Sequence, residues 1–432
     1  MRDQAIRARI WAALGAGAFS QVISLVIQLG SLPLFLMQWD PSRYGVWLML
    51  SAIPAYLSMA DVGLVTTAGN RMTMALARQQ VAAADRIFQT AQLFMVLVIS
   101  AILALAGSVI FGGWIQMPRE QAWALWWLTV AVLLSLAGGL AEAVFRSTHR
   151  YAQGTTWANL IRLLEWVASL LGLYLTDSFV GVATGMAMAR LLGLLVLVWR
   201  CDASQYQLSW GLNQASRQEL REMIKPAVSF MAFPLANALT FQGATLLVGW
   251  ILGPASVTAF NAARTVSRVA VQCTAIPAHA LWAEFSRLSA HTDVSALHQL
   301  YRRGWRSGLL LSVVLSAALY FVGPWLYQWW TAKQLSFDAD LMLILLIYAA
   351  VAGVWHVPRV LLMSTNQHSG LAVWQLVSSG LMLLIGWWGI TYGGLVAMAW
   401  SMLLMEVWLA GICIMQVRSR FHQGPVSGVV LP

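Results

Sequence analysis

Five arginines lie deep inside long apolar stretches of this 432-residue sequence: Arg162, Arg190, Arg264, Arg268 and Arg359. A guanidinium inside a bilayer is costly unless it faces a partner or a hydrated cavity, so such residues mark functional sites by default. The planar guanidinium fork matches the oxygens of phosphate and carboxylate groups. These residue types therefore indicate a cavity that binds an anion, with ion pairing between helices as the structural alternative.

Spacing along the chain divides these arginines. Arg162 lies three residues before Glu165, and Glu142 lies four residues before Arg146. Residues three or four apart share one helix face, so mutual neutralisation explains both pairs as well as function does.

Three of the arginines have no acidic residue within one turn of their own helix, namely Arg190, Arg264 and Arg268. Arg264 and Arg268 are four residues apart and share one helix face. We predict that Arg264 and Arg268 bind the anion. Arg190, Arg162 and Arg359 are predicted to assist.

Two carboxylates within the apolar stretches are candidates for binding a proton or a sodium ion. Asp61 lies in Met59-Ala-Asp-Val-Gly-Leu64, and Glu406 lies near the middle of a later stretch. Intramembrane acids serve in such relays, but they also form structural pairs with arginine. Both interpretations stay open for each residue.

The composition shows what must position these side chains. Hydrophobic residues make up 59% of the chain and charged residues 10%, with a mean hydropathy of +0.70. A soluble domain carries about 25% charged residues, so an all-α polytopic membrane protein is predicted. About twelve stretches are long enough to span a bilayer: 10–37, 43–69, 87–112, 121–147, 152–175, 178–200, 226–252, 255–283, 305–330, 338–364, 368–389 and 393–417.

The loop charges predict an orientation. With the N-terminus inside, eighteen Lys and Arg residues fall in the inside segments and three in the outside loops. This bias is typical of a multi-pass bacterial inner-membrane protein with both termini in the cytoplasm. The net charge of +10 then faces anionic lipid heads, and nucleic acid is not a predicted partner.

A short internal similarity predicts two lobes. The segment Trp39–Trp47 resembles Leu252–Phe260, with Pro41 aligned to Pro254. Duplicated halves around a central site are a transporter design. The predicted organisation is a six-helix lobe at 1–200, a cytoplasmic linker at 201–225, a six-helix lobe at 226–417 and a cytoplasmic tail at 418–432.

Several motifs are missing from the sequence. It has no P-loop, no HExxH, no GxSxG and no Cys/His cluster, and its three cysteines are far apart. We therefore expect no ATPase, no enzyme, no metal site and no cofactor.

The first two predicted spans carry a family resemblance. Leu32-Pro-Leu-Phe-Leu36, Tyr44-Gly-Val-Trp-Leu48, Ala60-Asp-Val-Gly-Leu64 and Gly69-Asn70 resemble the start of oligosaccharide-lipid flippases. These O-antigen and exopolysaccharide exporters share a superfamily with multidrug and toxic-compound extruders and with the lipid II flippase. The resemblance implies two six-helix lobes around a central cationic cavity. It also implies alternating-access flipping of an undecaprenyl-pyrophosphate-linked glycan, with polysaccharide polymerase and chain-length proteins as candidate partners.

Three alternatives remain. A cation-coupled multidrug antiporter would rely more on acids than on arginines within its helices. A membrane-embedded enzyme of polysaccharide assembly would need larger outside loops. A scaffold protein would leave the deep arginines unexplained.

Overall fold

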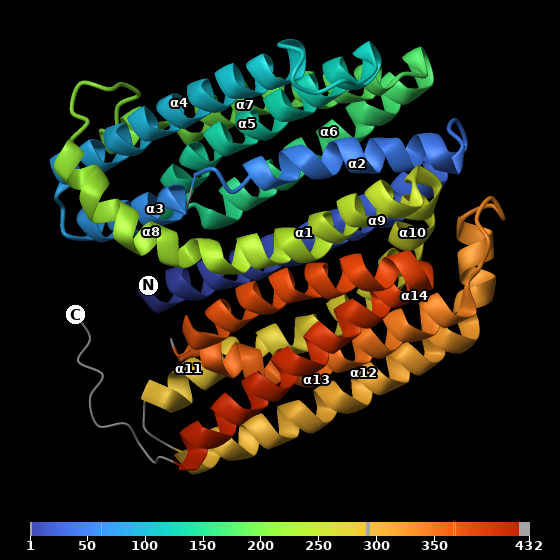
Figure 1. Ribbon diagram of the computed structural model, residues 1–432. Coiled ribbons are helices and arrows are strands. Elements are labelled where there is room, and N and C mark those ends of the chain that lie inside the picture. Colours follow the sequence, from blue (N-terminus) through green and yellow to red (C-terminus); the bar gives the residue numbers. More distant parts are fainter. Residues whose placement is uncertain (1, 62, 291–293, 366, 368, 423–432) are drawn as a thin grey trace. The chain divides into compact units, whose positions relative to one another are not determined.

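The computed structural model describes residues 2–61, 63–290, 294–365, 367 and 369–422, and the regular elements in them are all helices (Figure 1). The all-α polytopic fold predicted from the sequence is confirmed. The chain divides into two compact units. The first unit comprises residues 1–40 and 47–234, and the second comprises residues 41–46 and 235–432.

The first unit is built around α5 and α7. Its helices are α1 (Arg2–Leu36), α2 (Pro41–Leu57) from Trp47 onward, α3 (Leu64–Ala77), α4 (Val81–Phe111), α5 (Arg119–Ser147), α6 (Tyr151–Thr176), α7 (Phe179–Cys201), the short η1 (Ala203–Tyr206) and α8 (Arg217–Ala238) up to Pro234. α5 packs against α3, α4 and α7, and α6 packs against α1 and α7. Apolar side chains fill the core between them.

The second unit is built around α13. Its elements are the π-helix η2 (Leu239–Gly243), α9 (Ala244–Leu252), α10 (Pro254–Ala280), α11 (Trp282–Ala290), α12 (Val294–Trp330), α13 (Ala339–Ser364) and α14 (Ser369–His422). α13 packs against α10, α12 and α14 and is therefore the buried centre of this unit. Residues 423–432 of the predicted tail lie outside the described residues.

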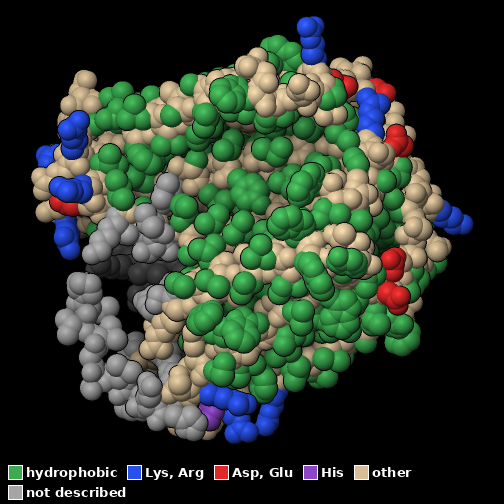
Figure 2. All heavy atoms as spheres, viewed as in Figure 1, with side chains coloured by type: hydrophobic (Ala, Val, Ile, Leu, Met, Phe, Trp, Pro, Cys, Tyr) green, Lys and Arg blue, Asp and Glu red, His purple; other side chains and the backbone are tan. Residues whose placement is uncertain are grey.

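In the described part of the chain, nine helices are long and apolar enough to cross a membrane. The ninth, Gly370–Ser419, contains a break at Gly394 with φ 57° and ψ −145°, so it holds the two spans predicted at 368–389 and 393–417. The span predicted at 255–283 forms α10 but carries Arg264 and Arg268, which lower its hydropathy. Figure 2 shows hydrophobic side chains covering most of the visible face, with charged side chains at its edges.

The single span predicted at 43–69 is wrong, because α2 ends at Leu57 and α3 begins at Leu64. The Asp61 carboxylate accepts a hydrogen bond from the Gly63 amide at 3.1 Å, and its carbonyl accepts one from the Leu64 amide at 2.8 Å. Gly63 has φ 74°, which favours glycine. Asp61 therefore stabilises a turn between two helices.

The two similar segments found in the sequence each contain the start of a helix. α2 starts at Pro41, and α10 starts at Pro254 after Gly253, whose φ is 84°. Proline suits the first position of a helix because its missing amide hydrogen would have no partner there. The Thr258 hydroxyl of α10 donates a hydrogen bond to the Pro41 carbonyl at 2.6 Å, so the two turns pack together inside the second unit.

The segment after α7 is fixed to the first unit by polar contacts. The Ser209 amide donates a hydrogen bond to Asp85 Oδ1 of α4 at 2.7 Å, and the Gly211 amide donates one to Gln92 Oε1 at 3.0 Å. These bonds place the segment against α4.

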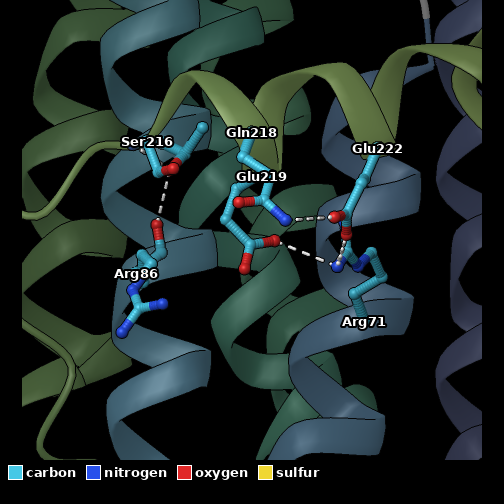
Figure 3. Close-up of polar contacts among 7 residues, drawn as sticks. Arg71, Arg86, Ser216, Gln218, Glu219 and Glu222 are labelled. Carbon is cyan, nitrogen blue, oxygen red and sulfur yellow. Dashed lines mark hydrogen bonds and ion pairs between the residues drawn. The ribbon is translucent and has the colours of Figure 1, made fainter.

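The start of α8 is held in the same way. Arg71 of α3 pairs with Glu219 at 3.0 Å and with Glu222 at 2.8 Å (Figure 3). Hydrogen bonds from Gln218 and Arg71 lower the pKa of Glu222, so its carboxylate stays ionised at neutral pH. The first turns of α8 are thus anchored to α3.

Candidate functional site

Arg264 lies in a polar cluster inside the second unit. Its Nη1 donates a hydrogen bond to the Phe241 carbonyl at 3.0 Å, and its Nη2 donates to Thr245 Oγ1 at 2.9 Å and to Asn261 Oδ1. Phe241 belongs to η2, where a π turn replaces the regular α-helical pattern. Arg264 is buried, and these three acceptors satisfy its guanidinium from within the protein.

The ring of Phe241 joins Arg264 to Arg268. The two guanidinium carbons lie 5.4 Å and 5.0 Å from the ring centroid, respectively. The negative face of an aromatic ring attracts cations, with a contribution of about 0.5–2 kcal/mol each. One ring therefore offsets part of the repulsion between two like charges. Arg268 is only partly buried, whereas Arg264 is buried.

A second group of polar residues lies on α13 and α14. Trp355 Nε1 donates a hydrogen bond to Glu406 Oε1 at 2.8 Å. The Arg359 guanidinium lies 5.5 Å from the Trp355 ring centroid and interacts electrostatically with Glu406. The tryptophan thus contacts one cation through its ring and one carboxylate through its indole nitrogen.

Tyr348 of α13 is buried, and α13 packs against both α10 and α14, so Tyr348 lies in the same part of the second unit as Arg264, Arg268, Arg359 and Glu406. We refer to these five residues as the arginine cluster. The cluster holds three guanidiniums and one carboxylate, so it carries an excess of two positive charges when all four are ionised. Nearby, His356 Nδ1 lies 3.1 Å from Thr274 Oγ1. The described residues contain no group of His, Cys, Asp and Glu that could hold a metal ion.

In the first unit, Arg190 has an acidic partner on a neighbouring helix. Arg190 of α7 forms a two-point ion pair with Glu165 of α6, and its Nη2 donates to Glu165 Oε2 at 2.5 Å. The ion-pair partner of Glu165 is thus Arg190, and Arg162, the neighbour suggested by spacing, interacts with Glu165 only electrostatically. Arg162 is exposed and donates a hydrogen bond to Ser24 Oγ at 3.1 Å.

Glu142 of α5 behaves differently from Glu165. It interacts electrostatically with both Arg146 and Arg190. Arg146, the neighbour on the same helix that spacing suggested, thus acts on Glu142 together with Arg190 of α7.

The sequence-predicted residues therefore fall into two sets. The second unit brings together Arg264, Arg268, Arg359 and Glu406, whereas Arg162 and Arg190 belong to the first unit and Asp61 to a turn. Sequence reasoning missed Phe241, Trp355 and Tyr348. Trp355 lies four residues before Arg359, and that spacing could have indicated the contact. Phe241 depends on the π turn, which no local pattern marks.

The arrangement of helices matches solved membrane transporters. A structure described as the inward-facing conformation of a multidrug resistance MATE family transporter of the MOP superfamily superimposes with a TM-score of 0.78, at 11% identity, over 94% of this chain and 95% of that one. The outward-facing conformation of such a transporter gives 0.65, at 11% identity, over 97% and 95%. The chain has the fold of these transporters.

A further solved structure agrees with this assignment. A MATE protein in complex with MaL6 superimposes with a TM-score of 0.65, at 12% identity, over 96% of both chains. Comparison of the sequence with protein-family models and with curated proteins gave no match. The similarity of this chain to MATE transporters is therefore a similarity of fold.

Proposed function

We propose that this chain is a transporter that moves an anionic, lipid-linked oligosaccharide across the bacterial inner membrane by alternating access. The observation that carries the proposal is the arginine cluster inside a MATE-like fold, where Arg264 and Arg268 share the Phe241 ring and Arg359 lies over Trp355. The substrate class is a glycan linked to undecaprenyl pyrophosphate, moved from the cytoplasmic to the periplasmic leaflet. Both termini would then lie in the cytoplasm.

The charge of the cluster supports an anionic substrate. Arg268 and Arg359 are partly buried, and each guanidinium lies over an aromatic ring. Such planar donors match pyrophosphate oxygens in a bidentate manner. Arg264 is buried and has three protein acceptors, so it would shape the site and add charge. Arg268 and Arg359 are less buried than Arg264 and would make the direct contacts.

The division of the chain supports alternating access. α2 begins in the second unit and continues in the first, and α8 begins in the first unit and ends before η2 of the second. Transporters of this kind change access when one half moves against the other. The two helices that pass between the units are therefore the natural places for a hinge.

Transport by purified protein in proteoliposomes tests this function. The substrate is a fluorescent polyprenyl-pyrophosphate-linked sugar, and a membrane-impermeant quencher reports how much of it reaches the opposite leaflet. We expect faster transfer with the protein than with empty liposomes, and inhibition by unlabelled polyprenyl pyrophosphate but not by polyprenol. Transfer equal to that of empty liposomes for several sugar heads would overturn the proposal.

A cation-coupled multidrug antiporter is the second candidate. The solved structures with this fold include ones described as multidrug resistance MATE transporters, and Glu406 is a buried carboxylate that a cation could neutralise. Efflux of a cationic dye that depends on a proton or sodium gradient, and that is abolished by Glu406→Gln, would favour this candidate. The excess of arginine over acid in the cluster favours the anionic substrate.

A further inference from the structure

The second unit has a basic pocket at the end where α12 begins and α14 ends. Its volume is about 340 Å³, and its lining includes Arg302 and Arg306 of α12 and Arg418 of α14. All three arginines are exposed, and no acidic side chain lines the pocket among the described residues. Figure 2 shows Lys or Arg side chains gathered with a histidine at the lower edge of the visible face, next to hydrophobic surface.

Aromatic side chains build the walls of the pocket. The Phe421 ring of α14 stacks on His298 of α12 at 4.6 Å between centroids and lies 5.5 Å from the ring of Tyr301. Trp305 Nε1 donates a hydrogen bond to the Val354 carbonyl at 2.8 Å, which fixes that ring against α13. The pocket thus has aromatic walls and is lined by three guanidinium groups.

The length of α12 places the pocket at the level of the lipid head groups. At the other end of the helix, Trp325 and Trp329 are exposed and stacked, 6.5 Å apart, as in a tryptophan belt at a membrane surface. From Trp325 to Arg306 the helix rises about 28 Å, close to the hydrocarbon thickness of about 30 Å. Arg302 lies one further turn away, outside the hydrocarbon.

We propose that this pocket binds the phosphate head group of an anionic membrane lipid. Arginine forks match phosphate oxygens, and basic pockets between membrane helices are suited to such head groups. The apolar surface beside the pocket would carry the acyl chains. The inference does not rest on the proposed transport function, because none of the residues lining the pocket belongs to the arginine cluster.

The test measures lipid binding to the full-length protein by native mass spectrometry in neutral detergent. The probes are phosphatidylglycerol, phosphatidylcholine of the same chain length, and inorganic phosphate. The pocket variant is R302Q/R306Q/R418Q. The matched control is R217Q/R221Q/R303Q, which removes the same charge from exposed arginines that do not line the pocket. R306Q/R418Q serves as a second pocket variant if the triple variant is unstable.

We expect phosphatidylglycerol to bind the native protein in preference to phosphatidylcholine. The pocket variants should weaken that binding by about tenfold or more, and the control by less than about twofold. Equal losses in the pocket and control variants, or no loss in either, would overturn the proposal. If inorganic phosphate binds the native protein as tightly as phosphatidylglycerol does, the pocket binds a soluble anion. This result would also overturn the proposal of a lipid site.

Discussion

Gly45 packs against the backbone of Pro254 with no room for a side chain. A Cβ atom at Gly45 would lie 1.8 Å from the Pro254 carbonyl oxygen and 2.4 Å from its carbonyl carbon. This contact joins the first turn of α2 to the first turn of α10. The start of α2 is thereby fixed to the second unit, although the rest of the helix belongs to the first.

Gly45→Ala should therefore destabilise the protein. Neither backbone can yield without moving a helix, so the expected loss is about 1–3 kcal/mol. Thermal unfolding in detergent, followed by tryptophan fluorescence, measures the change. Gly411→Ala is the matched control, because a Cβ there meets no atom within 4 Å. Equal unfolding temperatures for the two variants would contradict the close packing.

The Arg190–Glu165 pair should behave as a coupled unit. Removing one partner leaves a charge without compensation in the apolar region, which costs about 3–5 kcal/mol in comparable buried pairs. R190Q and E165Q are each expected to lower stability strongly, and the double variant E165Q/R190Q to recover part of the loss. Reversible unfolding in a denaturing detergent measures the free energies.

Arg162 provides the control for that pair. It is exposed and makes a hydrogen bond with Ser24, so R162Q should cost about 1 kcal/mol or less. Suppose that the losses of unfolding free energy in E165Q and R190Q are additive, and that R162Q loses as much as either. This result would show that Glu165 does not pair with Arg190.

Arg264 should tolerate lysine poorly. Its guanidinium reaches three acceptors, one each on η2, α9 and α10, and a lysine ammonium is a point charge that cannot reproduce this planar arrangement. Arg264→Lys is thus expected to lower the unfolding temperature nearly as much as Arg264→Ala. Arg268→Lys should stay close to the native protein. Equal stability of Arg264→Lys and the native protein would contradict the structural role of Arg264.

Asp85 should hold the segment that follows α7 in place. Asp85→Ala removes the acceptor of the Ser209 amide, so amides at 209–211 are expected to exchange with deuterium about tenfold faster or more. Hydrogen–deuterium exchange with peptide-level mass spectrometry measures this. Arg71→Gln is the control, because it removes the pairs with Glu219 and Glu222 at the start of α8 only. Unchanged exchange at 209–211 in Asp85→Ala would show that Asp85 does not anchor this segment.

The sequence indicated most of the helices but not how their charges pair. Apolar runs long enough to span a bilayer predict helices because the backbone must satisfy its own hydrogen bonds there. The signal for the break after Leu57 was present in Asp61 and Gly63, a turn pair inside an apolar run. Glu165 and Arg190 are 25 residues apart on two helices, and only tertiary packing brings them together.

The candidate site, too, could be predicted from the sequence only in part. Depth and charge identified Arg264, Arg268, Arg359 and Glu406, because an ionised side chain stands out in an apolar run. Their different roles depend on neighbours that the sequence does not mark. The π turn presents the Phe241 carbonyl to Arg264 and the Phe241 ring to both Arg264 and Arg268.

The central claim is that the arginine cluster carries an anionic substrate. The most direct measurement is complementation of a flippase-deficient bacterium by the native chain and by Arg268→Ala and Arg268→Lys, with equal amounts of protein in the membrane. We expect Arg268→Ala to lose glycan export and Arg268→Lys to restore part of it, because lysine keeps the charge but lacks the planar guanidinium. Full export by both variants would show that Arg268 does not bind the substrate.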